Sequence, residues 1–272
     1  MAAKEEDIRL SQALAKIKHR LLIFSGKGGV GKSTVAANLA LALAMKNFKV
    51  GLLDVDIHGP NLPKMLGVEE KRLDISPKGI KAVEVNGNLK LVSMAFLLED
   101  PDLPVIWRGP MKMKVIQQFL SDVEWGELDW LIADSPPGTG DEPLSVTQLI
   151  PATGAIIVTT PQEVSLMDSR KAVVFARKLN LKIYGIIENM SGLICPHCGK
   201  KIDLFKEGGG FRAALEMGVP FLGKIPIDPR IVASGDDGKP FVSSLPVSEA
   251  SLAFMKIVDK IIADATPPKK ES

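Results

Sequence analysis

The sequence lacks the features that mark several large classes of protein. Two cysteines in 272 residues exclude a scaffold held together by disulfides. A formal net charge of +2 gives none of the Lys and Arg excess by which proteins bind nucleic acid non-specifically. No apolar run reaches membrane-spanning length, and the opening MAAKEEDIRLSQALAKIKHR has no apolar signal-peptide core. We therefore expect a cytoplasmic protein with no membrane and no nucleic-acid partner.

Aromatic residues are also scarce, at 5%, whereas hydrophobic residues make up 46% of the chain. Most of the apolar residues are Ala, Val, Leu and Ile, which suits helices packed on a buried parallel sheet. The sequence predicts an α/β fold, a mostly parallel β-sheet flanked by helices on both faces in three layers. We expect strands at 21–25, 49–54, 88–94, 129–134, 154–160 and 182–189, and helices at 5–19, 34–46, 109–120, 165–179, 210–217 and 248–263.

The chain shows no linker, repeat or low-complexity tract, so one domain is predicted. We divide it into an N-terminal lead-in helix at 1–20, a single domain at 21–264 with a C-x-x-C loop at 195–198, and a flexible tail at 265–272. Residues 58–104 are the least regular part of the pattern.

A glycine-rich motif follows the first predicted strand. Residues Gly26–Ser33, GKGGVGKS, satisfy G-x-x-x-x-G-K-[ST] between a strand and a helix, the context that separates a P-loop from an ordinary turn. Backbone N–H groups and the helix dipole bind phosphate in such loops. Lys32 is predicted to reach the β- and γ-phosphates of ATP, and Ser33 to ligate Mg²⁺. The nucleotide-binding residues predicted here are Gly26, Lys27, Gly28, Gly29, Val30, Gly31, Lys32, Ser33 and Thr34.

Three aspartates lie where predicted strands end. Asp54 and Asp56 follow the strand at 49–54, and Asp134 closes the strand at 129–134. Parallel sheets bind ligands at this edge, so we expect the three carboxylates close to the P-loop. We interpret Asp134 as the carboxylate that holds Mg²⁺, directly or through water, and Asp54 as an assisting group near the metal. The alternative is that Asp54 and Asp56 are two solvated aspartates of a loop.

The P-loop carries a second lysine, Lys27, that phosphate binding within one subunit does not require. This KGGxGK[ST] form resembles the deviant-Walker ATPases, which include the nitrogenase iron protein, septum-site and plasmid-partitioning ATPases, and iron–sulfur carriers. The resemblance implies a homodimer with Lys27 crossing to the partner's nucleotide. It further implies that Asp56 orients the attacking water and that Gly138, in PPGTGD, offers its N–H to the γ-phosphate. The predicted catalytic residues are thus Lys27, Lys32, Asp56 and Asp134.

The same resemblance locates the adenine base. Asn189, at the end of the strand predicted at 182–189, corresponds to an asparagine against the adenine edge. The segment PIDPR at 226–230 corresponds to the other side of the base, which adds Asp228 and Arg230 as candidates. Capping a turn is the alternative role of Asn189.

The two cysteines form the pattern C-P-H-C at Cys195 and Cys198, but a tetrahedral metal site needs four ligands. With GKGGVGKS, DVDIHGPNLP, WRGPM and DSPPGTGDE, the string ENMSGLICPHCG resembles the Mrp/ApbC-type iron–sulfur cluster carriers over residues 21–254. The resemblance implies that Cys195 and Cys198 of two subunits share one [4Fe–4S] cluster, since twofold symmetry doubles two thiolates to four.

Other interpretations of the cysteines stay open. Four cysteines at a dimer interface also suit zinc, with His197 between them pointing away from the metal. Thiol oxidoreductases use the same spacing, although at the start of a helix in a different fold. A structural knuckle with no transfer role is the third alternative.

The predicted function is a slow ATPase that uses ATP with Mg²⁺, carries a [4Fe–4S] cluster and passes it to apo iron–sulfur proteins. The alternative is a positioning or partitioning ATPase with a structural zinc or an inert C-x-x-C. Such an ATPase needs a surface for membrane or DNA. The last predicted helix has an apolar stripe, which we attribute to core packing because its opposite face is not strongly basic (Leu252, Met255, Val258, Ile261 and Ile262). A reductase subunit like the nitrogenase iron protein is disfavoured, because its cluster ligands are not paired as C-x-x-C.

Overall fold

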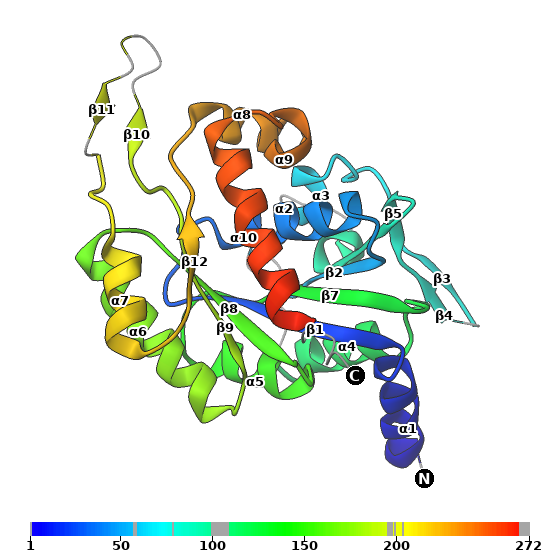
Figure 1. The fold of residues 1–272 in the computed structure, drawn as a ribbon. Coiled ribbons are helices and arrows are strands. Elements are labelled where there is room, and N and C mark those ends of the chain that lie inside the picture. Colours follow the sequence, from blue (N-terminus) through cyan, green and yellow to red (C-terminus); the bar gives the residue numbers. More distant parts are fainter. Residues whose placement is uncertain are drawn as a thin grey trace, which may run out of the picture.

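The computed structural model describes residues 2–56, 59–77, 79–98, 109–194, 198, 200–202 and 204–266. Its centre is an eight-stranded sheet in the order β12-β9-β8-β1-β7-β2-β6-β5 (Figure 1). All neighbouring strands are parallel except β5 and β6. The strands are β1 (Ile17–Ser25), β2 (Val50–Asp54), β5 (Val83–Asn86), β6 (Leu89–Ser93), β7 (Leu128–Asp134), β8 (Gly154–Thr159), β9 (Ile183–Glu188) and β12 (Phe221–Lys224).

Helices cover both faces of this sheet, which confirms the predicted three layers (Figure 1). One face carries α2 (Lys32–Met45), α3 (Leu62–Met65), α8 (Pro229–Asp236), α9 (Phe241–Ser244) and α10 (Glu249–Ala265). The other carries α1 (Ala2–Leu14), α4 (Gly109–Ser121), α5 (Asp141–Leu149), α6 (Glu163–Lys178) and α7 (Gly209–Met217). The remaining elements are a 3₁₀ helix, η1 (Met94–Leu97), and two hairpins, β3 (Asp74–Ser76) with β4 (Gly79–Lys81) and β10 (Leu193–Ile194) with β11 (Lys201–Ile202).

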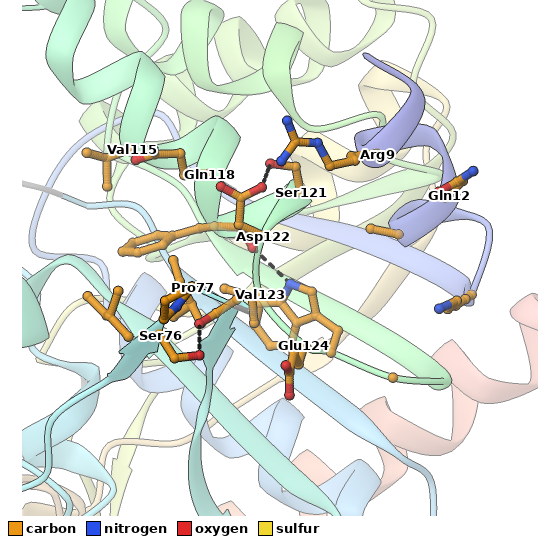
Figure 2. A pocket seen from close by; sticks show the side chains of 18 of the residues that line it. Arg9, Gln12, Ser76, Pro77, Val115, Gln118, Ser121, Asp122, Val123 and Glu124 are labelled. Atoms are coloured by element: carbon orange, nitrogen blue, oxygen red, sulfur yellow. Dashed lines mark hydrogen bonds between the residues drawn. The ribbon is translucent and has the colours of Figure 1, made fainter. Parts of the chain in front are cut away.

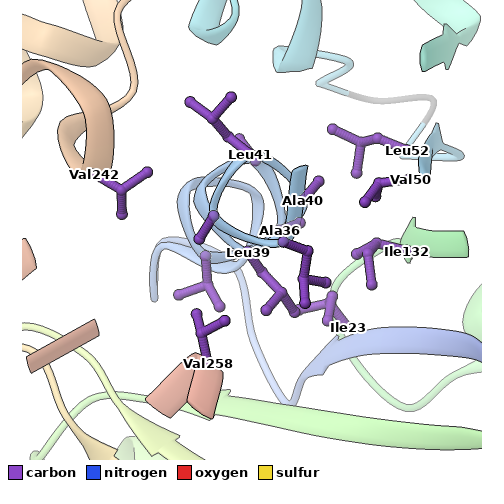
Figure 3. Packing of buried hydrophobic residues seen from close by; sticks show 14 of the residues in the cluster. Ile23, Ala36, Leu39, Ala40, Leu41, Val50, Leu52, Ile132, Val242 and Val258 are labelled. Atoms are coloured by element: carbon purple, nitrogen blue, oxygen red, sulfur yellow. The ribbon is translucent and has the colours of Figure 1, made fainter. Parts of the chain in front are cut away.

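Helix α2 lies inside the molecule because its sequence has no polar face. Ala36, Leu39 and Ala40 are fully buried, and the helix packs between the sheet and the α9–α10 region, where Val242 and Val258 close the cluster (Figure 3). Its alanines let the helix approach the strands closely, while each buried leucine contributes roughly 2 kcal/mol. The start of α2, which ends the P-loop, is therefore anchored in the core.

The bounds predicted for the first helix and the first strand were wrong. The helix predicted at 5–19 ends at Leu14, and β1 begins at Ile17 instead of residue 21. Residues 17–20 continue the ladder with β7, from Ile17 opposite Leu128 to Arg20 opposite Leu131. Polar side chains in KHR conceal this strand in the sequence, because backbone pairing rather than side-chain burial defines it there.

The apolar stripe of α10 packs largely as predicted. Val258 and Ile261 are fully buried, and Met255 and Ile262 pack against the same core, whereas Leu252 is 53% exposed and does not belong to it. Within the described residues, no helix is long and apolar enough to cross a membrane.

Candidate nucleotide site and cysteine arm

The P-loop connects the end of β1 to the start of α2, at the carboxyl edge of the sheet. Gly31 caps α2 with φ of 82°, a left-handed conformation that favours glycine. A Cβ at this position would lie 2.2 Å from Nδ2 of Asn189, which donates a hydrogen bond to the Val30 carbonyl oxygen at 2.9 Å. The loop and the end of β9 are thus in direct contact.

Lys32 lies between two carboxylates beneath this loop. Its Nζ donates to Oδ1 of Asp134 at 2.6 Å and lies 3.5 Å from Oδ2 of Asp56. Lys32 is only 6% exposed and Asp134 1%. The structure therefore brings together three of the four residues predicted to be catalytic.

Two buried oxygens beside Lys32 have no hydrogen-bond partner among the described residues, Oδ2 of Asp134 and Oδ1 of Asp56. Buried carboxylate oxygens without a partner are costly, and they are the ligands that Mg²⁺ prefers. Ser33 adds a hydroxyl oxygen next to them, 3.4 Å from Nζ of Lys32. The donor set thus fits the predicted metal.

Asp54 has a different environment. Both of its oxygens accept hydrogen bonds, from Ser93 Oγ at 2.8 Å and from the Asp56 backbone N–H at 3.3 Å. Complete burial, and then the charge of Asp134, raise the pKa of Asp54 to about 8. Burial also raises the pKa of Asp134, against the opposing effect of Lys32. Asp54 therefore holds the turn that presents Asp56, with Ser93 as its partner.

The exposed part of the loop is less constrained. Gly28 and Gly29 are exposed, and Gly26 lies against the backbone of Asp168 in α6. Lys27 is half-buried and makes no hydrogen bond or ion pair with any residue that the structure describes. The backbone N–H of Gly138 donates to the Ser25 carbonyl oxygen at 2.8 Å, so the predicted contact with a γ-phosphate requires this bond to be exchanged.

A cavity of about 530 Å³ adjoins the P-loop on the side predicted for the base. Thr34, Asn189 and Asp228 line it, together with apolar groups such as Ile227. Asp228 caps α8 and accepts three hydrogen bonds from the guanidinium of Arg230, at 2.6, 2.9 and 3.2 Å, which lower the pKa of Asp228. A mostly apolar cavity with a few polar groups at its rim suits a heterocyclic base.

A second cavity, of about 560 Å³, lies between α1, the β3–β4 hairpin and the end of α4 (Figure 2). Two of its polar side chains form hydrogen bonds within the lining. Ser121 Oγ donates to Asp122, and Trp125 Nε1 donates to the Phe119 carbonyl oxygen. No predicted site residue lines this cavity, and we assign no function to it.

The cysteines belong to residues 190–208, here called the cysteine arm, which contains the β10–β11 hairpin. The hairpin extends from the body of the molecule beside β12 and α7 (Figure 1). Cys198 is exposed and forms no disulfide. Cys195 and His197 lie outside the described residues, so their predicted roles stay predictions.

Sequence reasoning missed one buried acidic residue, Glu188, at the end of β9. Its side chain accepts hydrogen bonds from Ser191 Oγ and from the backbone N–H groups of Gly208 and Gly210. The available signal was an acidic residue closing an apolar strand, the same pattern that identified Asp54 and Asp134.

Comparison with known proteins gives a consistent result. A family model described as ParA: NUBPL iron-transfer P-loop NTPase matches residues 16–262. A Methanocaldococcus jannaschii protein named iron-sulfur cluster carrier protein is 52% identical over 98% of this chain and 91% of the relative. A Kluyveromyces lactis protein named cytosolic Fe-S cluster assembly factor CFD1 is 47% identical over 96% of each chain.

Solved structures share the fold along most of the chain. A nucleotide-binding protein from Archaeoglobus fulgidus, in complex with ADP, has a TM-score of 0.77 at 39% identity and covers 86% of this chain and 91% of its own. The cell division ATPase MinD of Pyrococcus furiosus has a TM-score of 0.68 at 26% identity, with coverage of 90% and 98%. The similarity therefore includes both the P-loop and the sheet around it.

Proposed function

The chain belongs to the NUBPL iron-transfer P-loop NTPases, and from this premise we propose that it is an ATP-hydrolysing carrier of a [4Fe–4S] cluster. In this proposal a homodimer holds the cluster between its subunits and passes it to apo iron–sulfur proteins. The observation that carries the proposal is the junction at Asn189, where a P-loop site and an arm bearing an exposed Cys198 meet in one chain.

The nucleotide half of the proposal rests on the groups around Lys32. ATP phosphates at the P-loop would replace the carboxylates as partners of Lys32, which frees Asp134 and Asp56 for other roles. We assign Mg²⁺ to Ser33 and Asp134, which would hold the metal where it could neutralise phosphate charge, and water orientation to Asp56. The half-buried Lys27, without a partner among the described residues, supports its assignment to the nucleotide of a second subunit.

The cluster half rests on the cysteine arm and on the relatives. An arm that extends from the body can meet its copy across a twofold axis, which would supply four thiolates from Cys195 and Cys198. The M. jannaschii and K. lactis relatives are named as a carrier and an assembly factor for such clusters. The cluster is the cargo in this proposal, whereas ATP drives its release by changing the dimer.

The test is reconstitution of the protein with iron and sulfide after anaerobic purification. We expect about four iron and four sulfide per dimer, since a [4Fe–4S] cluster has four of each. Visible absorption should disappear in Cys195→Ala and Cys198→Ala. Transfer is read as activation of an apo iron–sulfur protein, accelerated by ATP in the wild type and not in Lys32→Ala. Zinc in place of iron, or a cluster that survives both cysteine substitutions, would contradict the carrier function.

A further inference from the structure

The two ends of the cysteine arm are joined through one buried side chain. Glu188 is fully buried at the end of β9, immediately before the arm begins. Its Oε1 accepts hydrogen bonds from Ser191 Oγ, on the outgoing end, and from the Gly208 backbone N–H at 3.0 Å, on the returning end. Its Oε2 accepts from the Gly210 N–H, in the first turn of α7. One carboxyl group therefore connects both ends of the arm to the sheet.

The outgoing end is also hydrogen-bonded to the segment that follows β12. The Ser191 N–H donates to the Ile225 carbonyl oxygen at 2.9 Å, and the Ile227 N–H donates to the Gly192 carbonyl oxygen at 2.8 Å. Gly192 has φ of 78°, and a Cβ there would lie 1.9 Å from Oε1 of Glu207, so the two ends are in close contact. The two segments of the arm thus pack against each other where they leave the body of the protein.

Residues on both sides of the arm's attachment line the cavity that we assign to the adenine base of the nucleotide. Asn189, next to Glu188 in sequence, lines the cavity and contacts the P-loop through Val30. Ile227, whose backbone N–H pairs with the Gly192 carbonyl oxygen, lines its other side together with Asp228. Met190, Leu204 and Phe205 of the arm itself also line the cavity. A ligand there therefore touches the arm directly as well as the residues that flank its attachment.

We propose that Glu188 is a positioning residue that couples the cysteine arm to the base side of the nucleotide site. Its hydrogen bonds make the arm's two ends move with Asn189 and with the segment 225–228. Nucleotide binding then changes the order of the arm by a route separate from Asp56 and Gly138, on the opposite side of the P-loop. The relevance of this coupling to cluster release rests on the proposed function, but the coupling itself does not.

The chemistry of the site explains why a carboxyl group is required. Three donors converge on Glu188 in a buried position, and alanine would leave the Gly208 and Gly210 N–H groups without their acceptor. Glutamine keeps one carbonyl oxygen and turns an NH₂ group toward the remaining donor. Glu188→Gln should therefore retain part of the connection, and Glu188→Ala should lose it. Glu163→Gln is the matched control, since Glu163 pairs with Arg212 of α7 on the surface.

The experiment is amide hydrogen exchange of the full chain with and without ADP, together with calorimetric titration of ADP. In the wild type, ADP should slow exchange at residues 191–194 and 206–210, which do not line the cavity and therefore report the connection through Glu188. In Glu188→Ala we expect exchange there about tenfold faster without ligand, the scale of one lost buried hydrogen bond. The ADP-dependent slowing should be lost, although Kd for ADP changes less than threefold. Glu188→Gln should give an intermediate response and Glu163→Gln a wild-type response.

Two results would overturn the coupling. One is a wild-type response to ADP in Glu188→Ala, and the other is no response at the arm in the wild type itself. If Glu188→Ala does not fold, Glu188→Gln decides the question by the same comparison with Glu163→Gln. Failure of the wild type to bind iron and sulfide would contradict the carrier function but leave this exchange result intact, so the two failures are distinguishable.

Discussion

The nucleotide site and the cysteine arm are held in place by different means. In the nucleotide site, Lys32, Asp56 and Asp134 are buried beneath one continuous loop. A carboxylate oxygen of each aspartate lies within 3.5 Å of Nζ of Lys32. The arm extends outward, and the buried hydrogen bonds that attach it to the body converge on Glu188. Substitutions in the nucleotide site should therefore change both the free energy of unfolding and nucleotide binding. Substitutions near the end of the arm should change cluster binding alone.

Lys32→Ala should have the largest effect and tests the first half of this comparison. It leaves the buried Asp134 without its cation, so we expect a loss of about 3–5 kcal/mol in the free energy of unfolding without ligand. Binding of ADP should fall below detection. Urea unfolding and calorimetry measure the two effects. Lys27→Ala is the control in the same loop, and an equal loss of stability in both variants would show that the buried pair does not stabilise the fold.

Gly31→Ala should follow in size. Its left-handed φ costs an alanine about 1–2 kcal/mol, and displacement of Asn189 breaks a hydrogen bond worth about 1 kcal/mol more. ADP affinity should fall as well, because the variant disturbs the loop and the base contact together. Gly28→Ala is the matched substitution, since a Cβ there meets no atom within 4 Å. Similar melting temperatures of the two variants would contradict this account.

Asp54→Asn should produce a smaller and pH-dependent effect. The folded protein raises the pKa of Asp54 from 3.8 to about 8, so the folded state retains a proton that the unfolded chain loses. This contribution to stability is complete below pH 4 and is lost as the pH rises toward 8. At pH 8 the asparagine variant should be more stable than the wild type, with the difference vanishing near pH 4. Urea unfolding across this range measures it, and a pH-independent difference would contradict the buried proton.

Cys198→Ser should have the smallest effect on stability and the sharpest effect on the cargo. Cys198 is exposed, so the free energy of unfolding and ADP affinity should stay at wild-type values. Cluster content after reconstitution should be abolished. A loss of ADP affinity in the same variant would contradict this prediction, because it would show that Cys198 also affects the nucleotide site.

The same contrast explains what could be predicted from the sequence. The P-loop is a continuous motif, and Asp54, Asp56 and Asp134 follow apolar strands whose carboxyl ends must meet in a parallel sheet. Their proximity to Lys32 was therefore predictable. The role of Ser93 was not, because it depends on β6 pairing next to β2, in the least regular part of the pattern.

The base of the arm was harder to predict for a similar reason. Glu188 binds backbone N–H groups about twenty residues further along, after a hairpin whose length no motif fixes. Hydrogen bonds from backbone N–H groups cannot be predicted from residue type, and the glycines at Gly208 and Gly210 are the one indication in the sequence. Asn189 was predicted through the family resemblance, whereas its contact with Val30 required the structure.

The order of strands in the sheet has a consequence for synthesis of the chain. Within the described residues, the central strand β1 pairs with β7 and β8 alone, whose residues begin at Leu128 and Gly154, whereas β2 pairs with the earlier β6 as well as with β7. A nascent chain that stops before Leu128 therefore contains the complete P-loop motif but no strand to hold β1 in the sheet. Strand β7, which lies between β1 and β2, is completed only when about half of the chain has been synthesised. We therefore expect the loop to reach its final conformation only after that point.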